Sequence, residues 1–587
     1  MIRLLKNMRR REVGMFLLCC VLVVVQVFFD LRLPDYMTEL TTLIKTGGET
    51  GDLVAVGMKM LGCALISALL AVGCGFLSAK TASGFSFAVR EKLFHHVMSL
   101  GREEMQNFSV PSLITRTTND ITQIQMIIAM GMQMLLKAPI MAVWALIKIL
   151  GKSWELSAVT AGFVVAICAT ILAVMSVCLP RFRLVQKMTD RINRAARENL
   201  TGILVVHAFN AEEYQNEKFD VPSREMFRLQ TKNQHLFALI QPVMGLGMNG
   251  LALVIYWLGA ALVNAIPLSD PAARLTMFSD VLVFSTYATY VVMSFMMLVM
   301  IFMLLPQAQV SAERICEVLD QKIGIVEGTR TEGNGTGNVE FRNVSFRYPG
   351  ASEDELQNLN FCVRKGETLA IIGATGSGKT TLVNLIPRFY DAGTGEVLVD
   401  GVNVKDYTFD ALYNKIGYVT QKAVLFAGSI RENVFFGESA AAESGENLER
   451  ALSVSQAKEF VEKLPDGSAH PVAQLGRNMS GGQKQRLSVA RALARQPEIL
   501  IFDDSFSALD YRTDAKLRAE LSENFRDTTK IIVAQRISTI RHADRILVLD
   551  RGRIVGDGTH DGLMDSCPVY REIALSQLSA AELKEGR

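Results

Sequence analysis

The sequence predicts a two-part chain: an N-terminal all-α membrane domain of six helices, followed by an α/β domain with a helical subdomain. Its 587 residues exceed the roughly 150 of one average domain. Hydrophobic residues make up 49% and charged residues only 20%, whereas soluble domains carry about 25% charge. The long apolar stretches are confined to the first half, so that half is the membrane domain.

Six stretches are long enough to cross a hydrocarbon core, which takes about 20 apolar residues. The basic start followed by an apolar run resembles a signal peptide, but no small-residue cleavage site follows, so we expect a membrane anchor. The six expected spans cover residues 13–33, 53–78, 126–150, 156–179, 236–266 and 278–305.

The connecting segments predict the orientation, because Lys and Arg gather on the cytosolic side. Segments 1–12, 80–125 and 181–235 hold 5, 5 and 10 of these residues. The alternate segments hold 2, 1 and 1. Both termini and the α/β domain are therefore expected in the cytosol, in a multi-pass protein of the plasma membrane.

The expected domains are a membrane domain at 1–320, a linker at 321–337 and an α/β domain at 338–587. The two long interior connections are polar and poor in Gly and Pro. Since long structureless loops are uncommon in compact proteins, we expect the helices to continue past the membrane and turn back. A net charge of +2 gives no basic excess that would indicate nucleic-acid binding.

The clearest motif follows an apolar strand at residues 368–372 and precedes a helical run expected from Thr381 to Phe389. Its glycines turn backbone N–H groups onto phosphates, Lys379 neutralises their charge, and the Thr380 hydroxyl can ligate Mg²⁺. The motif predicts a nucleotide site that binds ATP and Mg²⁺. Its residues are Gly373, Ala374, Thr375, Gly376, Ser377, Gly378, Lys379, Thr380 and Thr381.

A second apolar strand, at residues 499–502, ends in Asp503 and Asp504. In phosphate-loop ATPases an acid at this place holds Mg²⁺, and the next position carries the group that orients the attacking water. Asp503 is therefore the predicted metal residue, and Asp504 the predicted base.

Between these motifs the chain resembles the ATP-binding cassette (ABC) family, whose signature is Leu-Ser-Gly-Gly-Gln. Here Met479 replaces the leucine, and Ser507 to Asp510 follow the second acid in the family's order. The resemblance implies a P-loop NTPase cassette and, with six spans before it, an exporter half-transporter. It implies that Tyr348 stacks on adenine, that Gln421 serves Mg²⁺ and catalysis, and that ATP lies between one chain's phosphate loop and a second chain's signature. The signature residues are Ser480, Gly481, Gly482 and Gln483.

Two positions depart from the family pattern. Asp504 stands where Glu is usual, which withdraws the carboxylate by about one methylene, and a 1 Å displacement can cost on the order of 10²-fold in rate. Gln535 stands where His is usual and cannot carry positive charge. Because the signature is intact, we predict a degenerate site in a heterodimer whose other chain supplies Glu and His. The alternatives are a slow homodimeric exporter and an ATP-gated regulator or channel.

The cargo is less constrained by the sequence. The resemblance implies export of amphipathic drugs, lipids or peptides. Charged residues within spans are often functional, and Lys137 lies midway along the third apolar run. Its side chain either lines a central cavity, favouring acidic substrates, or reaches the inner headgroups.

Overall fold

The computed structural model describes residues 2–150, 153–333, 335, 337–438, 441 and 443–577. The chain divides into two compact units. We call Met1–Met98 with Val110–Gln321 the helical unit, and Ser99–Ser109 with Lys322–Arg587 the cassette unit. Positions 334 and 336 of the predicted linker, and the last ten residues of the predicted α/β domain, lie outside the described residues.

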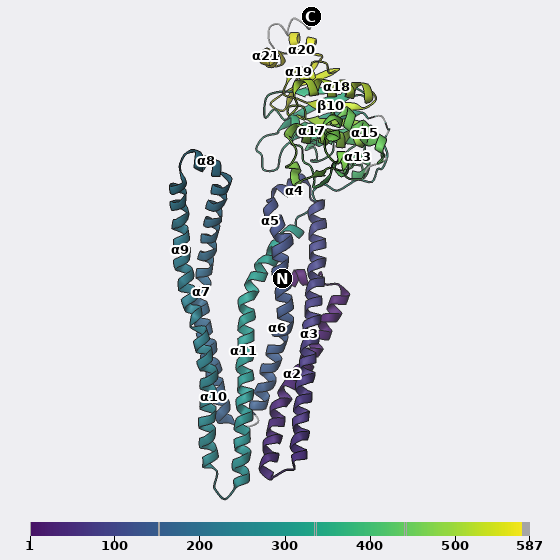
Figure 1. Ribbon diagram of the computed structural model, residues 1–587. Coiled ribbons are helices and arrows are strands. Elements are labelled where there is room, and N and C mark those ends of the chain that lie inside the picture. The colour runs from purple at the N-terminus through teal and green to yellow at the C-terminus, as the bar shows by residue number, and fades with distance from the viewer. Residues whose placement is uncertain are drawn as a thin grey trace. The chain divides into compact units, whose positions relative to one another are not determined.

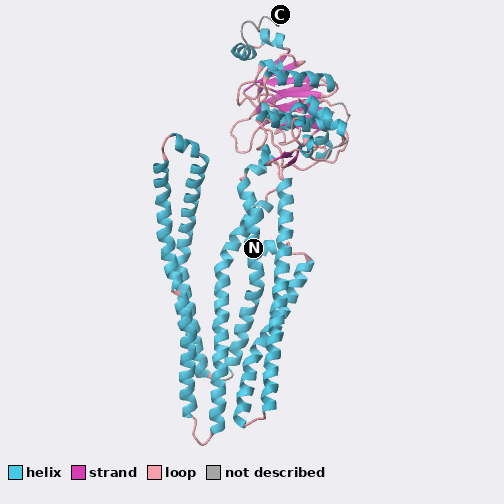
Figure 2. Cartoon of the chain, viewed as in Figure 1, coloured by secondary structure: helices cyan, strands magenta, loops and turns pink. Residues whose placement is uncertain are grey.

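Among the residues that the structure describes, the helical unit has six helical spans that are long and apolar enough to cross a membrane, as the sequence predicted. They run side by side in Figure 1, and Figure 2 shows no strand among them. The elements are α1 (Ile2–Leu5), α2 (Arg10–Thr46), α3 (Thr50–Ser99), α5 (Val110–Thr115), a π-helical turn (Arg116–Asp120), α6 (Ile121–Leu150), α7 (Trp154–Thr201), α8 (Ile203–Ala208), α9 (Glu212–Ala238), α10 (Ile240–Ala265) and α11 (Pro271–Leu319).

The helix α7 is much longer than a membrane is thick. Its 48 residues extend about 72 Å at 1.5 Å per residue, against roughly 30 Å of hydrocarbon. It is capped by Ser153, whose side chain accepts from the N–H of Leu156. After α7, α8 turns the chain so that α9 packs back along α7 (Figure 1). This confirms that the second interior connection consists of helices that continue and turn back.

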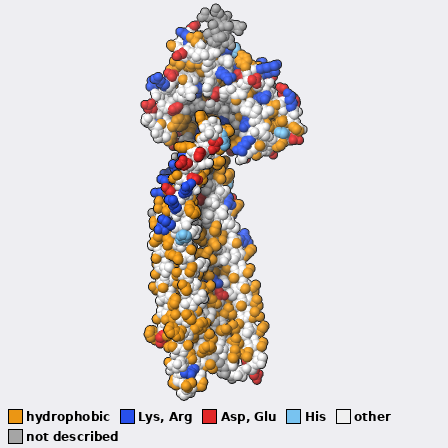
Figure 3. Space-filling view, turned by 60° about the vertical axis from the view of Figure 1, so that its left-hand side comes forward, with side chains coloured by type: hydrophobic (Ala, Val, Ile, Leu, Met, Phe, Trp, Pro, Cys, Tyr) orange, Lys and Arg blue, Asp and Glu red, His pale blue; other side chains and the backbone are white. Residues whose placement is uncertain are grey.

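The outer surface of the helical unit is apolar. Large hydrophobic side chains cover its long helices in Figure 3. Leu69, Val72 and Trp257 are 72%, 71% and 78% exposed. Water would make such continuous exposure unfavourable, whereas lipid tails solvate it.

Two ion pairs join α2 to α6 within the span helices. Lys137 Nζ lies 3.0 Å from Asp30 Oδ2, with the two side chains only 23% and 16% exposed. Lys148 Nζ lies 2.7 Å from Asp35 Oδ2, and the buried Tyr287 of α11 donates to Asp35 Oδ1 at 2.6 Å. Lys137 is thus bound to an acid of a neighbouring helix, a partner that sequence reasoning missed.

The cassette unit is built on a six-stranded sheet of order β12-β11-β3-β10-β9-β6. Only β12 is antiparallel to its neighbour. A second, antiparallel sheet has the order β2-β1-β4-β5. The strands are β1 (Val339–Phe346), β2 (Leu356–Val363), β3 (Thr368–Ile372), β4 (Thr394–Val399), β5 (Val402–Asn403), β6 (Ile416–Val419), β9 (Ile499–Asp503), β10 (Thr529–Val533), β11 (Arg545–Asp550) and β12 (Arg553–Gly558).

The central strands are apolar because both faces of a parallel sheet are covered. Every residue of β9 and β10 is buried. Helices flank this sheet in Figure 2. The helices of the cassette unit include α4 (Arg102–Gln106), α12 (Lys379–Leu385), α13 (Phe409–Lys415), α14 (Ile430–Val434), α15 (Gly445–Val454), α16 (Lys458–Glu462), α17 (Gly481–Ala494), α18 (Tyr511–Asn524), α19 (Ile537–Ile540), α20 (His560–Ser566) and α21 (Pro568–Gln577).

One local prediction needs correction. The helix after the phosphate loop, α12, begins at Lys379 and ends at Leu385 rather than running from Thr381 to Phe389; its early start places the loop glycines at the helix N-terminus. The segment Gly328–Arg330, expected to be linker, forms backbone hydrogen bonds with residues 406–408. A side chain at Gly328 would collide with the backbone of Asp406, so only glycine permits this approach.

Candidate nucleotide site

The phosphate loop connects the buried strand β3 to the N-terminus of α12. Gly376 and Gly378 have φ of +80° and +94°, a region that L side chains rarely adopt. Lys379 Nζ donates to the carbonyl oxygens of Gly373 and Ala374 at 2.8 Å each, and its burial lowers the pKa of the ammonium. The loop therefore holds a cation under backbone N–H groups, an arrangement that favours phosphate.

Asp503 ends β9 directly beside this loop. Thr380 Oγ1 donates to Asp503 Oδ1 at 2.9 Å, and Tyr418 of β6 donates to Oδ2 at 3.4 Å. The carboxylate is 3% exposed, and burial raises its pKa. A hydroxyl and a carboxylate in contact offer the hard oxygen ligands that Mg²⁺ prefers, so the residues fit the ion.

Asp504 follows in a left-handed conformation with φ +47°. Its Oδ2 accepts from Gln535 Nε2 at 2.8 Å and from Gln421 Nε2 at 3.2 Å. The structure thus gathers the three side chains that the sequence singled out as catalytic. Two amides share one carboxylate oxygen, and neither can bring a positive charge.

Tyr348 lies at the edge of the same unit, after β1. Its hydroxyl is 2.9 Å from Thr381 Oγ1, and its ring meets those of Phe346 and Tyr390 edge to face. The tyrosine is thereby held beside the first turn of α12, where a base attached to loop-bound phosphates can reach its ring.

The signature residues form the start of α17. Ser480 caps this helix, accepting from the N–H of Gln483 at 3.3 Å, while Gln483 Oε1 accepts from the N–H of Ser480 at 2.8 Å. Ser480 and Gly481 are exposed, with Gly482 half-buried between them and the helix. No hydrogen bond among the described residues joins this cap to the chain's own phosphate loop. An exposed helix N-terminus is suited to an anion presented from outside.

Comparison with known proteins agrees with this geometry. Residues 16–295 match the model of the ABC transporter transmembrane region, and residues 356–507 match that of the ABC transporter. An uncharacterized ABC transporter ATP-binding protein of Mycobacterium tuberculosis is 37% identical over 581 residues, 97% of each chain. The chain belongs to the ABC transporter family.

Two further comparisons narrow the type of ABC transporter. An ATP-dependent lipid A-core flippase of Pseudomonas aeruginosa is 31% identical over 497 residues, covering 83% of this chain and 79% of that one. A bacterial Atm1-family ABC exporter, solved with ATP bound, has the same fold, with a TM-score of 0.76, 24% identity and coverage of 98% and 99%. This ABC transporter is a half-transporter with the fold of an Atm1-family exporter, a multi-pass membrane protein whose ATPase is coupled to transport.

Sequence reasoning missed Tyr418, whose hydroxyl donates to Asp503, the predicted metal residue. Its hydroxyl lies 2.9 Å from Asn384 Oδ1 of α12 as well as near Asp503. Burial raises the pKa of this phenol, which keeps it a hydrogen-bond donor. The only signal was its place three residues before Gln421 in an ABC cassette.

Proposed function

We propose that this chain is one subunit of a heterodimeric ABC exporter and that its own nucleotide site binds MgATP but hydrolyses it slowly. The observation that carries the proposal is the shared Oδ2 of Asp504. A base that orients water must direct a carboxylate lone pair at that water, whereas one of the two oxygens of Asp504, Oδ2, already accepts from Gln421 and Gln535. Asp in place of the family's Glu also withdraws the carboxylate by about one methylene.

The proposed binding of MgATP uses the loop described above. Lys379 and the loop N–H groups bind the phosphates, and Thr380, Asp503 and Gln421 hold Mg²⁺. The ion neutralises charge that develops on the transferred phosphoryl group. The chain's own contribution is to position the nucleotide and to hold water weakly through Asp504.

The proposed partner is a second half-transporter with Glu and His at the positions of Asp504 and Gln535. The exposed cap at Ser480 supports this assignment, since it is available to complete the partner's site. Both termini and the cassette unit would lie in the cytosol of a cell whose plasma membrane carries the pair. An amphipathic cargo is proposed from the apolar helices and the likeness to lipid A-core flippases.

The test measures ATP hydrolysis by the purified chain alone in lipid nanodiscs. We expect turnover at least tenfold below that of the Asp504→Glu/Gln535→His variant, because the longer carboxylate and the imidazole restore the missing groups. Arg553→Gln, an exposed β12 change, is the matched control and should leave the rate unchanged. Fast hydrolysis by the unaltered chain, abolished by Asp504→Ala, would favour the homodimer.

Vesicle uptake separates a pump from a gate. With the partner present and ATP supplied, a fluorescent amphiphile should accumulate against its gradient. Equilibration without accumulation would instead identify an ATP-gated channel.

A further inference from the structure

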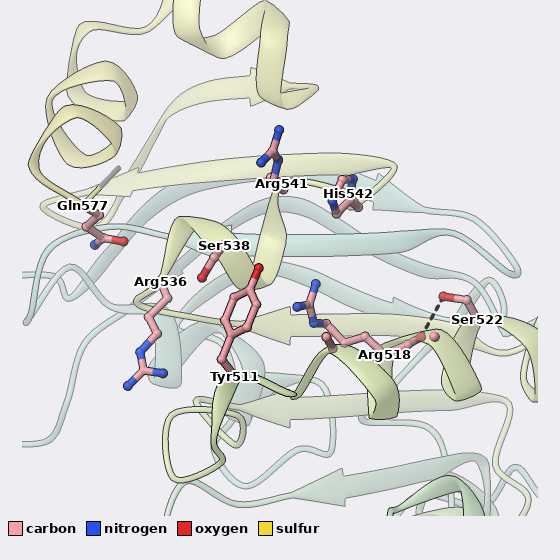
Figure 4. Close-up of a pocket in the computed structure, with 10 residues that line it drawn as sticks. Tyr511, Arg518, Ser522, Arg536, Ser538, Arg541, His542 and Gln577 are labelled. Atoms are coloured by element: carbon pink, nitrogen blue, oxygen red, sulfur yellow. Dashed lines mark hydrogen bonds between the residues drawn. The ribbon is translucent and has the colours of Figure 1, made fainter. Parts of the chain in front are cut away.

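A second polar cavity lies in the cassette unit, away from the phosphate loop. It has a volume of about 730 Å³, within the range of small-molecule sites. Figure 4 shows its walls, formed by one face of α18, the segment around α19 and the end of α21. The lining residues include Tyr511, Arg518, Arg536, Ser538, Arg541 and His542.

The basic side chains in this cavity play two different roles. Arg518 is held by Asp514, with Nε–Oδ1 3.0 Å and Nη2–Oδ2 3.2 Å, so it forms a fixed and locally neutral wall. Within the described part of the chain, the side chains of Arg536, Arg541 and His542 make no hydrogen bond or ion pair. Two unpaired guanidinium groups therefore give the cavity a positive charge, and the His542 imidazole lies in the same lining.

The arrangement selects the kind of anion. Figure 4 shows Arg536 and Arg541 on different sides of Tyr511, with their guanidinium groups turned away from each other and His542 beyond Arg541. Basic groups spread in this way favour an extended anion, such as a chain of phosphates, over a single small one. Guanidinium groups suit phosphate oxygens, and the hydroxyls of Tyr511 and Ser538 add donors. The Tyr511 ring, which is 72% exposed, can also stack on a base.

The cavity adjoins the segment that bears Gln535. Gln577 Nε2 donates to the carbonyl of Gln535 at 2.7 Å, and Gln577 Oε1 accepts from the N–H of Ile537 at 2.9 Å. Arg536 lies between the two clamped residues, and Gln535 in turn binds Asp504. A ligand that binds Arg536 thus acts on the backbone next to the nucleotide site.

We propose that this cavity is a second anion site, which binds a polyphosphate group through Arg536 and Arg541. Its source is either inorganic polyphosphate or the phosphate chain of a nucleotide. This site is distinct from the phosphate loop and does not depend on whether the partner is a second copy or a different chain.

The test is calorimetric titration of the full chain in nanodiscs with tripolyphosphate. Lys379→Ala disables the phosphate loop, so saturable binding in that background reports the second site. Because that change could disturb the loop, a parallel titration uses the unaltered chain saturated with a non-hydrolysable ATP analogue and Mg²⁺. We expect Arg536→Gln/Arg541→Gln to weaken binding at least tenfold in both titrations, and the exposed control Arg553→Gln to leave it within twofold.

Two further measurements sharpen the result. The Ile537 amide donates to Gln577 and directly follows Arg536. Hydrogen exchange at this amide should therefore slow when tripolyphosphate binds Arg536 and restrains the segment. If GTP binds more tightly than tripolyphosphate and Tyr511→Ala removes the difference, the source is a nucleotide; equal affinities indicate inorganic polyphosphate. Absence of saturable binding of tripolyphosphate, or binding that is unchanged in the double variant, would overturn the proposal. Binding of an acidic peptide but not of tripolyphosphate would overturn it as well.

Discussion

Replacing Asp30 by Asn tests the ion pair that joins α2 to α6. The change preserves shape and still accepts from Ser67, which donates to Asp30 Oδ1, so it isolates the loss of charge. Lys137, 23% exposed, would then be a largely buried cation without its partner. Breaking a buried pair costs about 3–5 kcal/mol, and the residual exposure of both side chains places the expected loss near 3 kcal/mol.

The assay is equilibrium unfolding in mixed micelles, analysed as a double-mutant cycle with Lys137→Met. The double variant should recover most of the lost free energy of unfolding, because it removes both charges together. Glu39→Gln is the matched control: it breaks the Lys59–Glu39 pair at 3.5 Å, whose side chains are 53% and 46% exposed. Exposed pairs contribute about 0–1 kcal/mol. If Asp30→Asn were no worse than this control, or if the double variant lost as much as the single one, the reasoning would be refuted.

Three other predictions concern the nucleotide site. Because burial lowers the pKa of Lys379 while bound phosphate favours the charged ammonium, ATP binding should take up protons at alkaline pH, seen as a buffer-dependent enthalpy; no uptake would contradict this. Because burial raises the pKa of Asp503 above the usual 3.8, the Mg²⁺-dependent affinity for ATP should fall on acidification, as the pH approaches this raised pKa. Tyr418→Phe should alter the pH midpoint of that fall in binding titrations, whereas the distant Tyr570→Phe should not. Gly378→Ala should weaken ATP binding about tenfold, since its φ of +94° costs about 1–2 kcal/mol for a side chain and the new Cβ would lie 2.7 Å from Leu356 Cδ2; unchanged affinity would show that the loop adapts.

Much of the nucleotide site could be predicted from spacing alone. The phosphate loop, Asp503 and Asp504 each follow a short apolar run, and the carboxyl ends of parallel strands meet at one edge of a sheet. The contact of Gln421 and Gln535 with a single oxygen of Asp504 could not be predicted, because it depends on side-chain directions across three separate segments. Tyr418 was missed for the same reason, as one tyrosine in a strand carries no signal of its own.

The sequence by itself determined the six spans, the cassette and the two departures at Asp504 and Gln535, because apolar length and local motifs are properties of neighbouring residues. Only the tertiary structure decided which distant groups meet. It paired Lys137 with Asp30 across 107 positions of chain, and it placed Gln577 against Gln535. Such contacts follow from how helices and strands pack, and packing depends on shape and burial over the whole unit rather than on any local pattern.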